Sequence, residues 1–415
     1  MARPAQNRIA GTLAAMAMFA AAATEASAQE QLVLNNQLQL GDVISGQTLN
    51  VEDAGEQVTV STAATGNSLS GGVQGGSLTL RNVQRVNGGV SSATTLNLRG
   101  DTEGVVNATT QSNGNYVAGG AYGANLAIDS DQSVGPGEIV ASSTIPGGTA
   151  RLLSGASVGV AASANTMALG GTGTDISGAV HQTSDSSVRA GNLAQTQYIP
   201  ATAIFGAQAL GNATAINGES VSSQNIYVGQ RSTGDIVTAD VSANAGNAWD
   251  LTGTATANAN QAVLANHGGS VVARTQQENA SAVASTARVT SYDFGAAMAS
   301  AQGGGNVVSV GTESDYLELD NSQLNTGGVE VQATFAGTNG YDAYVSADAL
   351  GNSVTGYACA ACEATLTANN VQHNEGNVSA SASTTVYGQG RAAITGTNAV
   401  GNAATFYVSR PGSGQ

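Results

Sequence analysis

Apolar and small polar residues alternate along short stretches of this chain. Residues 378–387, with the sequence VSASASTTVY, show the pattern clearly, because Val, Ala or Thr occupies every second position. A period of two with frequent Thr and Val predicts β-strands, and the Gly and Asn residues between the stretches predict tight turns. After the N-terminal segment no apolar pattern is sustained at helical spacing. The chain is therefore predicted to be all-β.

The predicted strands belong to an internal repeat, which is marked by the motif Gln-x-x-x-Gly-x-Val. The cleanest copies begin at Gln84, Gln323 and Gln372. Successive glutamines are 48, 50, 48, 47, 46 and 49 residues apart when four weaker copies are included, which begin at Gln132, Gln182, Gln230 and Gln277. Such regular spacing indicates one structural unit repeated along the chain.

An asparagine, often preceded by Gly, lies 17 to 20 residues ahead of each of these glutamines. The asparagines are Asn67, Asn115, Asn165, Asn212, Asn260, Asn306 and Asn352, and an eighth copy is Asn402. No glutamine motif follows Asn402. Seven full units and a terminal half unit are typical of a stack of repeats with a distinct end.

Short strands cannot form a core singly, but stacked repeats can bury a narrow interior of Ala, Val, Ile and Leu. We therefore predict a repetitive β-solenoid of the parallel β-helix type. The unit is about twice as long as the ~20–30 residue repeat common in solenoids, so each 48-residue unit is expected to make about two rungs. About sixteen rungs at ~4.8 Å would give a rod of roughly 75 Å. The expected segments are a signal peptide (1–28), an N-terminal cap (29–60), the solenoid (61–410) and a disordered tail (411–415).

The recurring amides have two interpretations. In register they would stack as ladders, each side chain donating a hydrogen bond to one neighbour and accepting one from the other. They could instead form a sugar-binding face, because amides hydrogen-bond well to polysaccharide. We favour the ladder, because register in a stack requires something at a fixed period, and a partner could use the same surface. The Gly after each Gln is expected to adopt a left-handed turn conformation.

The charge of the chain excludes several classes of function. Its 415 residues contain 28 Asp and Glu against 12 basic residues, all of them Arg, for a net charge of −16. Without Lys there is no Schiff-base chemistry and no phosphate-loop lysine, and the acidic balance makes nucleic acid a poor partner. We expect no cofactor.

The N-terminus indicates export. Arg3 and Arg8 precede an apolar run from Ile9 to Ala23, and residues 26–28 (ASA) form a small-residue cleavage site before Gln29. These features are typical of a secretory signal peptide. Position 29 is not Cys, and no later stretch approaches the ~18 apolar residues of a membrane-spanning helix. Surface attachment is therefore expected to depend on partners.

Few residues suggest chemistry. Cys359 and Cys362 form a C-x-x-C pair, for which a local disulfide is the expected state in an oxidising compartment. We expect no metal site, because His373 alone lies near the pair, and no catalytic role for the three histidines. Carboxylates are the one route to an enzyme, and those that we considered are Glu313, Asp315, Glu318 and Asp320.

The signal peptide, the acidic lysine-free body and amide motifs such as residues 370–378 (NVQHNEGNV) together resemble the holdfast anchor protein HfaD family of stalked α-proteobacteria. The resemblance implies an outer-membrane-associated surface protein that helps to attach the adhesive polysaccharide holdfast to the cell envelope. It implies other anchor proteins of the HfaA and HfaB type as partners. HfaB is similar to the curli secretion lipoprotein, which implies export of this chain in an unfolded state.

Two alternatives remain beside a holdfast anchor that is not an enzyme. A curli-like or filamentous β-helix adhesin would share the architecture, although curli repeats are about half as long as this unit. Such stacks can also pair end to end, so a homo-oligomer is an open expectation. A polysaccharide-processing enzyme would use clustered carboxylates in a groove of the same fold.

Overall fold

The computed structural model describes residues 30–359 and 363–408, and over these residues the protein is a β-solenoid without a helix. The predicted fold class is confirmed. The strands are β1 (Glu30–Gln39), β2 (Val43–Val51), β3 (Val58–Val86), β4 (Val90–Leu98), β5 (Asp101–Thr102), β6 (Val106–Val134), β7 (Glu138–Ile145), β8 (Arg151–Leu152), β9 (Ala156–Thr172), β10 (Asp175–Ser184), β11 (Ser187–Glu219), β12 (Ser223–Ser232), β13 (Ile236–Asn266), β14 (Val271–Asn279), β15 (Ala282–Thr312), β16 (Tyr316–Asn325), β17 (Val329–Ala358), β18 (Thr365–Asn374), β19 (Val378–Val386) and β20 (Ala392–Val408).

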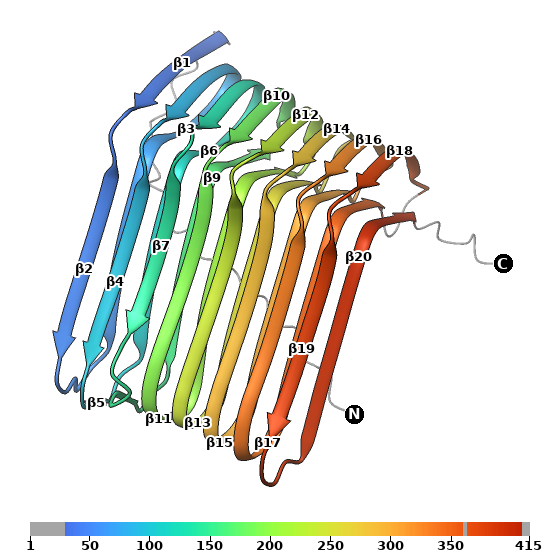
Figure 1. Cartoon of the computed structure of the whole chain (residues 1–415). Helices are drawn as coiled ribbons and strands as arrows, with labels where there is room; N and C mark the ends of the chain where they lie inside the picture. The colour runs from blue at the N-terminus through green and yellow to red at the C-terminus, as the bar shows by residue number, and fades with distance from the viewer. Residues whose placement is uncertain (1–29, 360–362, 409–415) are drawn as a thin grey trace.

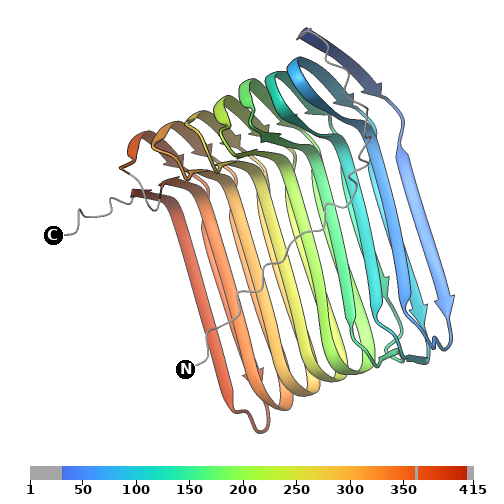
Figure 2. The ribbon, with the colours of Figure 1, turned by 180° about the vertical axis from the view of Figure 1, so that it is seen from behind.

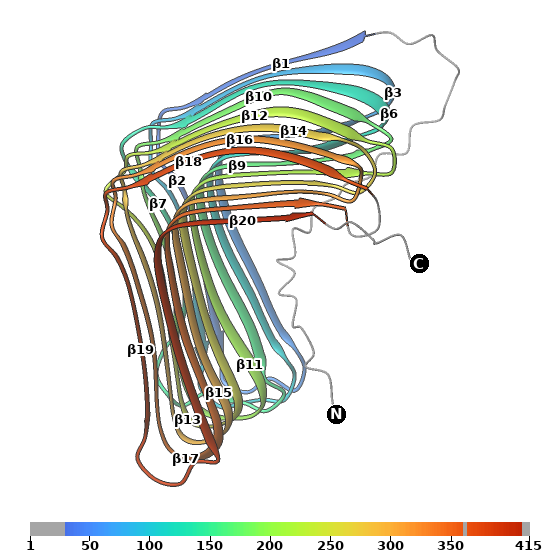
Figure 3. The same cartoon turned by 90° about the vertical axis from the view of Figure 1, so that its right-hand side faces the viewer.

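Every coil of the solenoid has an L-shaped cross-section with an upright leg and a shorter arm (Figure 3). The chain first runs along the outer side of the arm, in what we call the arm strand. It then descends the leg as the leg strand (Figure 1), and finally climbs back as the return strand, which bends at the elbow into the arm. The return strands form the opposite side of the leg (Figure 2).

The long strands of the structure combine these parts. The arm strands are β1, the ends of β3 and β6, β10, β12, β14, β16 and β18. The leg strands are β2, β4, β7, the starts of β11, β13, β15 and β17, and β19. The return strands are the starts of β3 and β6, β9, the ends of β11, β13, β15 and β17, and β20.

The predicted two rungs per unit are wrong, because each unit makes one coil. Neighbouring strands pair in parallel, and the paired residues are 46 to 50 positions apart, as in Val58 with Val106 and Ile236 with Ala282. An L-shaped coil contains three strands and three turns, which together take up all the residues of one repeat unit. Eight such coils at ~4.8 Å give a stack of about 38 Å, half the predicted length.

Two separate hydrophobic cores run along the stack. The leg core lies between leg and return strands and is built largely from Val and Ala, with Phe294 and Phe335 in edge-on contact. The arm core lies between the arm strands and the ends of the return strands and contains residues such as Met167, Ile226 and Leu317. Inward positions alternate with outward ones along nearly every strand, which is the period that the sequence displays.

The first coil includes residues of the predicted N-terminal cap. β1 pairs with the end of β3, and β2 pairs with β4, in the same parallel register as later coils. The proposed signal peptide and the C-terminal tail lie outside the described residues, so those segment boundaries stay predictions.

Candidate functional site

The repeated asparagines lie side by side at the elbow, where each return strand bends into the arm. Each Nδ2 donates to Oδ1 of the asparagine in the next coil at 2.7–2.9 Å, from Asn67 through to Asn402. From Asn67 to Asn352, the second hydrogen of each amide goes to a backbone carbonyl in the arm strand of the next coil, as from Asn212 to Arg231. All are buried except Asn402 in the last coil. These asparagines therefore link each coil to the one that follows.

The repeated glutamines form a second row, which faces the first across the elbow. Each Nε2 donates to Oε1 of the glutamine in the preceding coil at 2.7–2.9 Å. Its other hydrogen goes to the carbonyl after the asparagine of its own coil, as from Gln277 to Val307. The glutamines from Gln84 to Gln323 are buried, and Gln372 is half-buried.

The two rows run in opposite directions along the stack. Asparagine N–H groups point toward the C-terminal coil, whereas glutamine N–H groups point toward the N-terminal coil. Both hydrogens of each interior amide are used, which matters because an unpaired buried polar group costs about 1–3 kcal/mol. The rows form a satisfied polar partition between the leg core and the arm core.

One further glutamine, in the first coil, belongs to this row and was not predicted from the sequence. Gln37 in β1 accepts from Gln84 at 2.9 Å and donates to the Ser68 carbonyl at 3.0 Å. Residues 37–43 (QLQLGDV) match the repeat motif, and Gln37 precedes Gln84 by 47 residues, so the repeat period could have found it. The first coil therefore carries the same pair of amides as the others.

The expected left-handed conformation of the motif glycines is wrong. Gly88, Gly327 and Gly376 are not among the glycines with positive φ. Each is instead pressed against the backbone of the coil below, since a Cβ on Gly327 would lie 2.1 Å from the Ser281 carbonyl oxygen. Close approach between coils, rather than a special φ, requires glycine here.

The other candidate residues lie apart from the elbow. Cys359 is buried at the end of β17, whereas Cys362 lies outside the described residues, so the disulfide between them stays a prediction. A ring nitrogen of His373 lies 2.9 Å from a carboxylate oxygen of Glu375, and one of His267 lies 3.2 Å from a carboxylate oxygen of Glu313. The ring of the third histidine, His181, packs against the Tyr227 ring in a tilted arrangement.

The four carboxylates considered for catalysis lie in and just before β16. The Tyr316 hydroxyl donates to Glu318 at 2.8 Å, which raises the pKa of Tyr316, and Asp320 accepts from Asn369 at 3.0 Å. Asp315 accepts from the hydroxyl of its neighbour Ser314. The structure does not gather the four around a cavity. A hollow of about 450 Å³ lies elsewhere, between Arg99 and Pro146.

A model of the HfaD family, described as holdfast attachment protein D, matches residues 52–328. The chain belongs to this family. The resemblance seen in the sequence is thereby confirmed, and the matched region contains the amide rows from Asn67 to Gln323. No curated protein and no solved structure matches the chain.

Within 30–359 and 363–408, no three or more His, Cys, Asp or Glu side chains are grouped so that they could hold a metal ion. In the same part of the chain, no helix has the length and apolar character needed to cross a membrane.

Proposed function

We propose that this protein is exported and anchors an adhesive polysaccharide holdfast to the cell envelope, as an outer-membrane-associated surface protein. The observation that carries the proposal is the family match over residues 52–328. The signal-peptide pattern at residues 1–28 supports export. Other anchor proteins of the HfaA and HfaB type would hold it at the membrane.

In this proposal the amide rows have a structural task. The interior amides are buried and their hydrogens are already bonded within the protein, so they offer little to a polysaccharide. Their contribution is register, because a slipped coil would leave buried amides without partners. A stack locked in this way would suit a protein that must hold an external load.

The test is deletion of the gene in the cells that carry it, followed by lectin staining of the holdfast and a wash assay. We expect the cells to continue making adhesive material and to shed it into the medium. Normal retention of the material by deletion cells would contradict the proposal.

We further propose that the protein acts without catalysis. Purified protein incubated with acidic and neutral polysaccharides should release neither reducing ends nor unsaturated products. Release of either by the wild-type protein would instead favour the polysaccharide-processing alternative, and deletion cells would then retain adhesin of altered chain length.

A further inference from the structure

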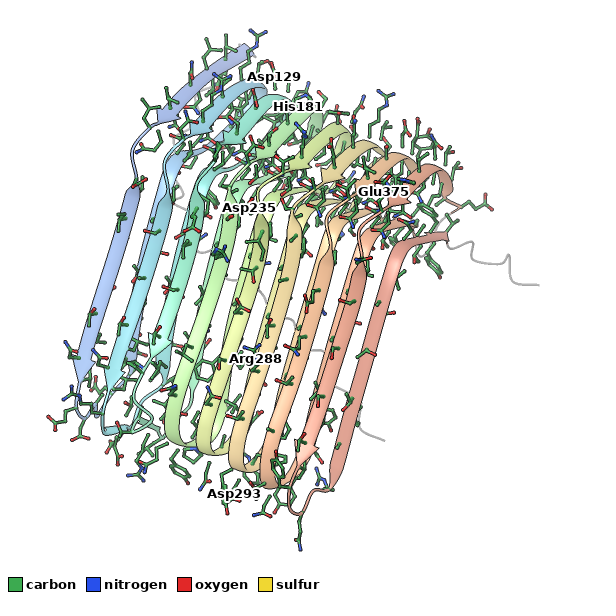
Figure 4. All side chains as sticks on the ribbon, viewed as in Figure 1. Asp129, His181, Asp235, Arg288, Asp293 and Glu375 are labelled. Atoms are coloured by element: carbon green, nitrogen blue, oxygen red, sulfur yellow. The ribbon has the colours of Figure 1, made fainter. Side chains whose placement is uncertain are left out.

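Exposed aromatic side chains gather at the lower turns of the leg, where leg strands pass into return strands. Trp249 in β13, Tyr292 in β15, Tyr341 in β17 and Tyr387 after β19 are 60%, 61%, 51% and 78% exposed. They come from four consecutive coils, and aromatic residues make up only 4% of the chain. We call these four residues the aromatic edge. The lower turns of β13, β15, β17 and β19 lie along the bottom of Figure 1, and Figure 4 labels Asp293 at one of these turns.

A row of polar residues runs through the middle of the aromatic edge. Asn247, Asp293 and Asn339 are paired in register on successive coils. Asn339 Nδ2 donates to Asp293 Oδ1, and the backbone N–H of Asp293 donates to Asn247 Oδ1, both at 3.3 Å. Planar amide and carboxylate groups therefore stand between the aromatic rings.

The rings alternate between the two sides of this polar row. Tyr292 and Tyr387 lie one position before the row, whereas Trp249 and Tyr341 lie two positions after it. The backbone positions that carry rings on the same side are therefore two coils apart, about 9.6 Å at the usual strand spacing.

The Trp249 and Tyr341 rings approach each other more closely than their backbone positions do, because the coil between them has a glycine at the equivalent position. A Cβ on Gly295 would lie 3.0 Å from the Trp249 ring, so glycine leaves the indole room to lie across the intervening coil. The indole then meets Tyr341 edge-on, with ring centroids 6.1 Å apart. Arg391 lies over the Tyr341 ring at 5.5 Å and pairs with Asp342. The rings are thus positioned by packing while staying open to solvent.

We propose that the aromatic edge binds an extended, uncharged polysaccharide chain, with sugar rings against the aromatic faces and hydroxyls on the polar row. The proposal rests on the proposed function and names its contact surface. Exposed Trp and Tyr combine an apolar face with a polar tip, which suits the two-faced character of a pyranose ring. Exposed aromatic groups of this kind mark interaction sites.

The periodicity of the edge favours a polymer over a protein partner. One exposed aromatic side chain on each of four consecutive coils makes a straight row, which suits a linear ligand that can contact them in turn. The charges favour a neutral chain, since Asp250, Asp293 and Asp342 line the turns with Arg391 as their cationic neighbour. A polyanion would be repelled by this edge.

Trp249 is the only tryptophan of the chain, so its fluorescence reports directly on the edge. Titration of the full-length protein with cellohexaose, an extended neutral glycan, should give a saturable change in this emission. Tyr341→Ala and Tyr292→Ala should weaken binding about tenfold each. Tyr122→Ala is the matched control, because Tyr122 is equally exposed at a distant turn, and it should leave binding unchanged. No saturable change, or equal losses in the control, would overturn the proposal.

A second measurement separates this proposal from the proposed function. Cells carrying a protein with Tyr292→Ala, Tyr341→Ala and Tyr387→Ala together should shed holdfast material as deletion cells do, with normal amounts of protein at the surface. If deletion cells shed the material but the triple variant retains it, the edge is not the contact and only this inference fails. Shedding by the triple variant without glycan binding by the purified wild type would assign the edge to a protein partner, which also overturns it.

Discussion

The elbow and the aromatic edge are built on the same coils, yet they differ in every other respect. At the elbow each coil places Asn and Gln at equivalent positions, buried and bonded to their copies above and below. At the lower turns the residues change from coil to coil, and their side chains face solvent. A position whose partner is its own copy must repeat, whereas a position that faces solvent is free to differ. The buried residues of the elbow therefore stabilise the stack, whereas the exposed residues of the lower turns are available to contact a partner.

The largest effect is expected from breaking the asparagine row in its middle. Asn212→Leu removes the acceptor of Asn165 and the donor to Arg231 and Asn260, so two buried amides and one part-buried carbonyl each lose a hydrogen-bond partner. We expect a loss of about 3 kcal/mol or more in the free energy of unfolding, measured with guanidinium chloride. Asn402→Leu, in the exposed last coil, serves as the control and should cost about 1 kcal/mol. Equal costs at the two positions would show that the row does not stabilise the stack.

A smaller loss is expected where two coils touch. Gly327→Ala forces a methyl group against the Ser281 carbonyl, and such overpacking costs about 1–3 kcal/mol. Gly159→Ala is the matched substitution, because a Cβ there meets no atom within 4 Å, and it should stay within about 0.5 kcal/mol of wild type. Thermal unfolding of both variants checks the difference. A neutral Gly327→Ala would mean that coils separate easily at this turn.

A modest dependence on pH is expected at the lower turns. The hydrogen bond from Arg391 lowers the pKa of Asp342 below its ordinary value. Because the folded-state pKa is the lower one, this pair contributes stability above the ordinary pKa of an Asp, and the contribution is lost as the pH falls through the folded value. Arg391→Gln should raise the pKa of Asp342, as followed by carboxyl-carbon NMR. An unchanged titration would show that the pair does not persist in solution.

The smallest effect on stability is expected at the aromatic edge itself. Tyr292→Ala removes an exposed ring and should change the unfolding free energy by no more than about 0.5 kcal/mol. The same substitution is expected to weaken glycan binding, so the two measurements together sharpen the contrast with Asn212→Leu. A large loss of stability would show that Tyr292, like the amides at the elbow, stabilises the stack of coils.

The features that could be predicted from the sequence are those that follow from its repeat period. Glutamines about 48 residues apart gave the solenoid, and alternation within the unit gave its strands. The period does not state how often the chain turns within one unit, so the single L-shaped coil was missed. The aromatic edge was missed because its rings recur over two units, with Trp249 and Tyr341 92 residues apart. Gln37 was not predicted to belong to the glutamine row because it lies within the predicted N-terminal cap.

The opposed amide rows also bear on how the protein would respond to mechanical load. Hydrogen bonds of the sheets and of both rows point along the stack, so a pull on the two ends would stretch all the bonds between two coils at once. Force spread over so many bonds in parallel slows forced rupture, which is governed by the unfolding rate rather than by equilibrium stability. A sideways pull on one end would instead peel the terminal coil first, bond by bond. The direction of tension, more than its size, would then decide whether such a stack holds.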